Sequence, residues 1–106
     1  MRSALTAPCL HLFVCANRRP LDSPLGPGCA NSGEVLYDAL KEEVSSRRQF
    51  ADVWVTKTSC LGICPREGAT VIAYPLGHVF TEAFASEASA FYERELAAVR
   101  AHRAGR

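Results

Sequence analysis

The sequence predicts one small α/β (α+β) domain in which a mixed sheet packs against helices, with elements in the order β-α-β-β-β-α. The chain has 106 residues, which is the size of one domain. Two segments repeat apolar residues with the helical period, and four short segments are rich in strand-forming residues. No repeat, linker or low-complexity segment divides the chain. We therefore expect a single domain over residues 1–106, with flexible tails at 1–9 and 101–106.

The first part of the chain predicts a strand and a long loop. Residues 10–14 form a compact apolar run with β-branched and aromatic content, typical of a strand buried on both faces that ends at Cys15. Residues 16–30 contain prolines and glycines that exclude a helix or a central strand. A loop of this length inside a small domain is usually functional.

A helix is predicted over residues 32–48. Asn31 can cap it, and Glu34 completes a capping-box-like pair three residues later. Leu36 and Leu40 lie on one apolar face, as the helical period requires.

The second half of the chain predicts three strands and a closing helix. Residues 52–57 alternate with the period of a strand. Residues 69–74 and 78–81 are two short strands joined by a Pro-Leu-Gly turn, which predicts a hairpin. Ser86 is expected to cap the last helix, over residues 86–100.

Composition and charge exclude several classes of protein. Apolar residues make up 48% and charged residues 22% of the chain, and the formal net charge is +1. These values disfavour a disordered chain and an electrostatic binder of nucleic acid or membranes. No apolar stretch approaches the length of about 18 residues that spans a bilayer, and Pro8 and His11 interrupt the only segment resembling a secretory signal. We expect a soluble, cytoplasmic protein.

Five cysteines are the unusual feature of this composition. Disulfides are scarce in reducing cytosol, and an odd count cannot pair completely, so metal binding or redox work is favoured. Cys15, Cys29, Cys60 and Cys64 all fall in loops or at strand ends, whereas Cys9 precedes the first strand. Strands that end at Cys15 and just before Cys60 can lie side by side and bring both loops to one end of the sheet.

Four converging thiolates match the ligand requirement of an iron-sulfur cluster. An oxidised 2Fe-2S core with four thiolates carries a charge of about −2 and needs backbone amides and cations nearby. Gly62 allows its loop to turn amides toward the sulfurs. The cations closest in sequence, which can equally be plain surface charges, are Arg18, Arg19, Lys57 and Arg66.

A zinc site, a 4Fe-4S cluster and a redox-active dithiol are less favoured interpretations of the same cysteines. Structural zinc could use Cys60 and Cys64 with Cys29 and either Cys15 or His78, although the gap between Cys15 and Cys29 suits zinc poorly. A 4Fe-4S site has the same ligand count, but the closely spaced cysteines of bacterial ferredoxins are absent, and so is any C-x-x-C motif.

The remaining chemistry-bearing residues are expected to be structural. His11 and His78 lie on predicted strands, and His102 complements a helix C-terminus. No phosphate-binding loop, nucleophile elbow or zinc-protease helix is present, so we expect no enzyme. The residues expected in the core or at a dimer contact are Trp54, Phe91 and Tyr92.

The chain resembles the thioredoxin-like 2Fe-2S ferredoxins over residues 11–96. The residues that carry the resemblance are Phe13-Val14-Cys15, Arg19-Pro20, Pro24, Gly26, Cys29-Ala30, Gly33, Val55-Thr56, Cys60-Leu61-Gly62, Cys64, Tyr74-Pro75 and Gly77. The sequence departs from the family pattern after the last cysteine, where Pro65-Arg66-Glu67 precedes Gly68, and at Phe80, where tyrosine is usual.

The resemblance implies a thioredoxin-like fold, a 2Fe-2S cluster near the surface, a homodimer and one-electron transfer between redox partner proteins, a reductase and an acceptor. It implies Cys15, Cys29, Cys60 and Cys64 as the ligands and leaves Cys9 outside the site. Two alternatives to a free carrier stay open. The protein could be a redox-sensing or protective binding protein, or an electron-transfer component docked in a larger oxidoreductase complex.

Overall fold

The computed structural model describes residues 1–4, 6–17, 30–59, 61–62 and 67–105. The predicted order of strands and helices is confirmed, with one short 3-10 turn, η1, added before the last helix. The elements are β1 (Leu10–Cys15), α1 (Ala30–Arg47), β2 (Val53–Thr58), β3 (Ala69–Tyr74), β4 (His78–Ala83), η1 (Ala85–Glu87) and α2 (Ala88–Ala104). Helix α2 therefore extends into the segment expected to be a tail. Among the described residues, no helix is long and apolar enough to cross a membrane.

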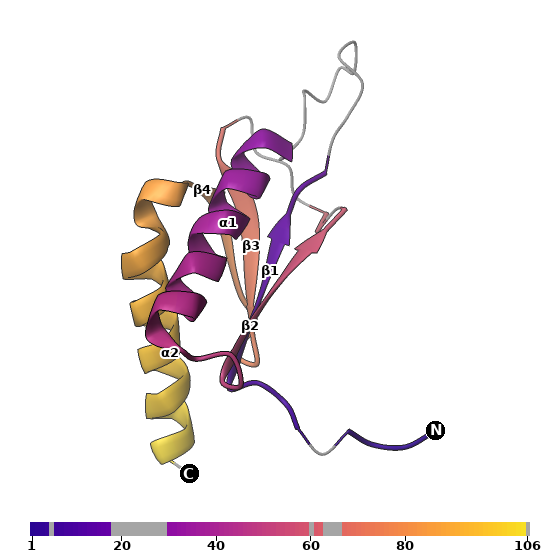
Figure 1. Cartoon of the computed structure of the whole chain (residues 1–106), viewed down its shortest axis with the longest axis vertical. Coiled ribbons are helices and arrows are strands. Elements are labelled where there is room, and N and C mark those ends of the chain that lie inside the picture. The colour runs from indigo at the N-terminus through magenta and orange to yellow at the C-terminus, as the bar shows by residue number, and fades with distance from the viewer. Residues whose placement is uncertain (5, 18–29, 60, 63–66, 106) are drawn as a thin grey trace.

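The four strands form one mixed sheet in the order β2-β1-β3-β4. Strand β1 pairs in parallel with β2 and antiparallel with β3, and β3 pairs antiparallel with β4. Because two parallel neighbours need a crossover, α1 returns the chain from the end of β1 to the start of β2. The carboxyl ends of β1 and β2, the start of β3 and the start of α1 consequently lie at one end of the sheet (Figure 1).

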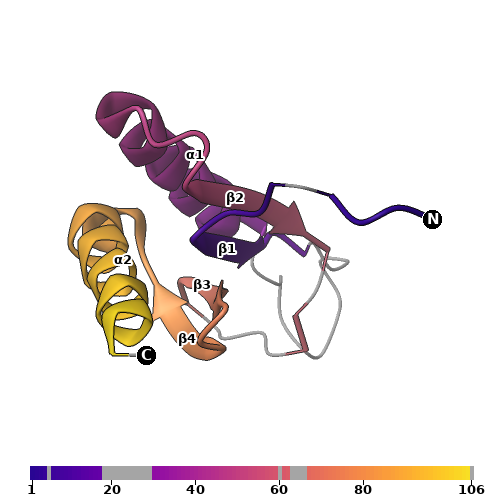
Figure 2. The ribbon, with the colours of Figure 1, turned by 90° about the horizontal axis from the view of Figure 1, so that it is seen from below.

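Both helices cover the same face of the sheet (Figure 2). The apolar residues that alternate toward this face form a single core between sheet and helices. The core includes Leu10, Leu12, Val14, Leu36, Leu40, Val53, Val55, Val71, Tyr92, Leu96 and Val99. This burial holds the cysteine-bearing end of β1 against the start of α1.

The other face of the sheet is not covered by any described helix. The expectation that residues 10–14 are buried on both faces is therefore wrong, since His11 and Phe13 are only half-buried. Their rings stack at 4.0 Å between centroids, and Trp54 and Tyr74 extend this aromatic cluster on the neighbouring strands. Aromatic residues suit a strand whether its second face is covered or not, so the pattern alone did not distinguish the two cases.

The helix ends differ from the predicted ones. Asn31 lies inside the first turn of α1 and so does not cap it. Ser86 lies inside η1, where Glu87 accepts a hydrogen bond from the Phe84 amide at 3.1 Å instead. Glutamate has the longer side chain and reaches back over this short turn, so it takes the capping contact. At the other end of α1, Arg48 adopts a φ of 53° and ends the helix in a left-handed residue.

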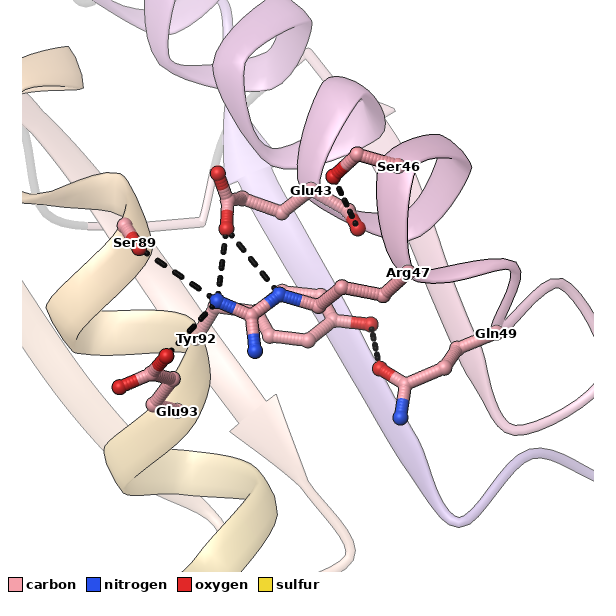
Figure 3. A network of polar contacts seen from close by, with 7 residues as sticks. All are labelled: Glu43, Ser46, Arg47, Gln49, Ser89, Tyr92 and Glu93. Atoms are coloured by element: carbon pink, nitrogen blue, oxygen red, sulfur yellow. Dashed lines mark hydrogen bonds and ion pairs between the residues drawn. The ribbon is translucent and has the colours of Figure 1, made fainter.

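A polar network joins the two helices on the side away from the sheet (Figure 3). The Arg47 guanidinium donates hydrogen bonds to Glu43 at 2.9 Å and to Glu93 at 3.0 Å, and it lies 4.9 Å from the centre of the Tyr92 ring. The Tyr92 hydroxyl donates to the Gln49 side chain at 2.7 Å. These contacts fix α2 to the end of α1 and account for Arg47 as a structural residue.

Candidate metal centre

Cys15 is the last residue of β1 and is completely buried. Its register partner is Thr58, the last residue of β2, and the next amide, of Ala16, donates to the Thr58 carbonyl at 2.9 Å. The two parallel strands thus end together, as the sequence predicts. The Cys15 thiol is free, and the buried end of the sheet holds it in place.

The other three predicted ligands, Cys29, Cys60 and Cys64, lie outside the described residues. Their described neighbours are Ala30 at the start of α1, Ser59 and Leu61 after β2, and Glu67 before β3. The strand directions place all of these neighbours at the Cys15 end of the sheet (Figure 1). The described residues that flank each predicted ligand thus lie at one end of the sheet, and the convergence of the four cysteines themselves stays a prediction.

Gly33 brings the first turn of α1 directly onto the end of β1. A Cβ atom at this position would lie 2.0 Å from the Cys15 carbonyl oxygen and 3.1 Å from the Ala16 Cα atom. Only glycine permits backbone segments to approach so closely. The start of α1, which follows Cys29 in sequence, is held against Cys15 for this reason.

Two further features at this end of the sheet fit a cysteine-ligated cluster. Gly62, between the second pair of predicted ligands, has a φ of 90°, the left-handed conformation that the sequence analysis expected a glycine to provide there. The Thr58 hydroxyl oxygen is buried and has no hydrogen-bond partner in the described part of the chain. A buried thiol, a glycine turn and a hydroxyl with no described partner all fit a cluster whose sulfur atoms accept hydrogen bonds.

Of the four cations predicted near the ligands, the structure describes Lys57 alone. Lys57 forms an ion pair with Glu34 on α1 at 3.0 Å and lies 4.9 Å from the centre of the Tyr37 ring. The hydrogen bond from Lys57 to Glu34 raises the pKa of the lysine, which therefore stays charged. This cation stabilises the packing of α1 on β2. The other three, Arg18, Arg19 and Arg66, lie outside the described residues.

Cys9 lies at the opposite end of β1 from Cys15. Six residue-to-residue steps of extended chain lead from one to the other, which corresponds to about 20 Å. The Cys9 sulfur accepts a hydrogen bond from Arg103 at 2.8 Å and lies 3.9 Å from an Asp52 carboxylate oxygen. Its exclusion from the ligand set stays a prediction.

The histidines on strands have structural partners, as predicted. His11 shares a 2.7 Å hydrogen bond with the Thr56 hydroxyl, and burial lowers its pKa, so the ring is neutral near pH 7. His78 donates to the buried carboxylate of Glu95 at 2.8 Å. Sequence reasoning missed Glu95, because a glutamate on a helix is normally exposed. No cluster of three or more metal-ligating side chains forms among the residues that the structure describes.

Comparison with known proteins identifies relatives of both sequence and fold. No protein-family model matches the chain. A 2Fe-2S ferredoxin of Clostridium pasteurianum is 33% identical over 67 residues, which cover 63% of this chain and 65% of that protein. A 2Fe-2S ferredoxin of Aquifex aeolicus is 31% identical over 68 residues, 63% of this chain and 60% of that protein. The matched region thus spans less than two thirds of either relative.

The fold agreement extends further than the sequence match. The crystal structure of the wild-type thioredoxin-like 2Fe-2S ferredoxin from Aquifex aeolicus superimposes with a TM-score of 0.75 at 26% sequence identity. The superposition covers 85% of this chain and 87% of that one. The expected mixed sheet with two helices is confirmed as the fold of those proteins. The chain is thus similar in sequence and in fold to thioredoxin-like 2Fe-2S ferredoxins.

Proposed function

We propose that the protein is a 2Fe-2S ferredoxin that carries single electrons between redox partner proteins and is not itself an enzyme. One observation carries the proposal: the described residues beside all four predicted ligands lie at one end of the sheet, where Cys15 is buried. The same fold in the Aquifex aeolicus protein belongs to a 2Fe-2S ferredoxin. Relatives named as 2Fe-2S ferredoxins support the same cofactor.

The ligands that we propose are Cys15, Cys29, Cys60 and Cys64. When bound, the cluster supplies a centre that takes up and gives back one electron. The chain supplies the buried end of β1 for Cys15 and a left-handed turn at Gly62. Because the sequence predicts the ligands in loops, we expect one side of the site to be accessible to a partner protein.

Four serine variants and one control test the cofactor and its ligands. Cys15→Ser, Cys29→Ser, Cys60→Ser and Cys64→Ser should each abolish or strongly change the visible absorption and paramagnetic resonance spectra of anaerobically purified protein. Cys9→Ala should leave both spectra unchanged, because Cys9 lies at the far end of β1. Bleaching by Cys9→Ala without an effect of Cys15→Ser would contradict the assignment.

Electron transfer itself needs a separate experiment. The reduced protein is mixed with candidate acceptors at several ionic strengths, and wild type is compared with Arg66→Glu. Redox encounters use small, partly electrostatic contacts, so we expect transfer to depend on salt and to weaken in the variant. A reduced cluster that passes electrons to no acceptor but changes a binding equilibrium would instead identify a redox sensor.

We also propose a cytoplasmic location and a homodimer, and the open face of the sheet supports the homodimer. Trp54 and Tyr74 are 42% and 47% exposed on this face, beside half-buried Phe13. Exposed apolar surface of this kind marks an interaction site. Trp54→Lys should convert the dimer to a monomer in sedimentation velocity. Phe50→Lys is the matched control, since Phe50 is exposed in the turn after α1. A wild-type monomer at about tens of micromolar would contradict the dimer.

A further inference from the structure

The Thr58 hydroxyl is buried without a hydrogen-bond partner in the described part of the chain. Its backbone is satisfied, because the Thr58 carbonyl accepts from the Ala16 amide at 2.9 Å. Leaving a buried hydroxyl unpaired costs free energy, and native proteins contain few such groups. A threonine that keeps one at the edge of a candidate metal centre is therefore a candidate for a contact with the bound group.

A second threonine on the same strand shows what an ordinary position looks like. Thr56 lies two residues earlier and points to the same face of the sheet as Thr58, because side chains alternate along a strand. Its hydroxyl is engaged in a 2.7 Å hydrogen bond with His11. Among the described residues, the lack of a hydrogen-bond partner thus distinguishes Thr58 from the other threonine on β2.

The neighbour of Thr58 across the strand pair is Cys15. The two residues are register partners on neighbouring parallel strands, so their side chains project from the same face. Neighbouring strands lie about 4.8 Å apart, which places such side chains within mutual reach. A neutral thiol is a weak acceptor, whereas an anionic sulfur accepts a hydrogen bond strongly.

We propose that the Thr58 hydroxyl donates a hydrogen bond to the Cys15 sulfur when that sulfur is a cluster ligand, and thereby raises the reduction potential. The inference rests on the proposed function. Reduction adds negative charge, which the ligand sulfurs share, so a donated hydrogen bond stabilises the reduced state more than the oxidised one. Thr58 is a positioning and tuning residue in this account and not a ligand.

Two substitutions separate the hydroxyl from the shape of the side chain. Thr58→Val keeps the branched shape and removes the donor, whereas Thr58→Ser keeps the donor. We expect Thr58→Val to shift the one-electron equilibrium about tenfold toward the oxidised state, which corresponds to about 59 mV of lowered potential. Thr58→Ser should retain a potential close to that of wild type. Thr56→Val is the matched control and should also leave the potential unchanged.

Unfolding of the apoprotein supplies an independent test, because Thr58→Val should not lower stability although it lowers the reduction potential. Removing a buried, unpaired hydroxyl should leave the urea midpoint of apo Thr58→Val equal to or above that of wild type. A purely structural role for Thr58 predicts the reverse, a lower midpoint with an unchanged potential. If Thr58→Val does not fold, Thr58→Ala and Thr58→Ser provide the same comparison of donor absent against donor present.

The outcomes distinguish this inference from the proposed function. A wild-type protein without a cluster would overturn both. A loaded wild type with the same potential in Thr58→Val would overturn only the role of Thr58. An equal fall in potential in the Thr56→Val control would also overturn it, since the effect would then not depend on proximity to Cys15.

Discussion

Substituting Gly33 with alanine tests whether the close packing of α1 on β1 builds the metal centre. The new Cβ atom would lie 2.0 Å from the Cys15 carbonyl oxygen, and the two next closest atoms, at 3.0 and 3.1 Å, are also backbone atoms. Favourable separations are about 3.5 Å, so helix and strand end would have to separate by about 1.5 Å. Backbone atoms cannot rotate out of the way as a side chain does.

The cost of Gly33→Ala follows from two opposing terms. Overpacking a close contact costs up to about 3 kcal/mol, and occasionally more. Alanine is better than glycine in a helix by about 1 kcal/mol, which offsets part of this. The free energy of unfolding should therefore fall by about 2 kcal/mol. For a domain of this size, that loss corresponds to a fall in Tm of about 8–16 °C.

Thermal and urea unfolding of the apoprotein, followed by far-ultraviolet circular dichroism, measures this effect. Gly105→Ala is the matched control, because its Cβ atom would meet nothing closer than the Ala101 carbonyl oxygen at 3.5 Å. We also expect Gly33→Ala to bind the cluster less well, since the start of α1 moves away from Cys15. A Gly33→Ala protein that melts with Gly105→Ala and loads fully would refute the reasoning.

Three further predictions concern hydrogen bonds and pH. Tyr92→Phe should lower the free energy of unfolding by about 1 kcal/mol in urea titrations, because the hydroxyl loses its bond to Gln49. Burial raises the pKa of Tyr92, so the protonated hydroxyl stabilises the folded state fully below about pH 10. This stabilisation is lost as the pH rises through the folded-state pKa. In that range the wild type should therefore lose more folding stability than Tyr92→Phe does. His78→Ala should cost about 2 kcal/mol, since the buried Glu95 carboxylate loses its 2.8 Å donor, and an unchanged urea midpoint would contradict this. Burial lowers the pKa of His11, so the contribution of the neutral ring to folding stability is present above about pH 6.5 and is lost as the pH falls through the folded-state pKa. The Tm of His11→Gln should therefore fall less on acidification than the Tm of the wild type.

Much of the architecture follows from local sequence patterns. Alternation and helical periodicity predict every strand and both helices in order, because each element needs one apolar face of matching period. The sequence analysis also expects the strands that end at Cys15 and just before Cys60 to lie side by side, and β1 and β2 do pair in parallel. The cysteine spacing and the surrounding residues resemble the thioredoxin-like 2Fe-2S ferredoxins, and the comparisons find similarity to such ferredoxins in sequence and in fold.

Only the tertiary structure decided how these elements share their surfaces. Both helices cover one face of the sheet, which leaves Phe13 and Trp54 on an open face that a strand pattern cannot distinguish from a second core. Lys57 is near a predicted ligand in sequence but is bound to Glu34 in space. That the Thr58 hydroxyl has no partner among the described residues is visible only in three dimensions, because hydrogen-bond satisfaction depends on neighbours brought together from distant parts of the chain. Local patterns determine which elements form, whereas contacts between elements determine which side chains remain available for function.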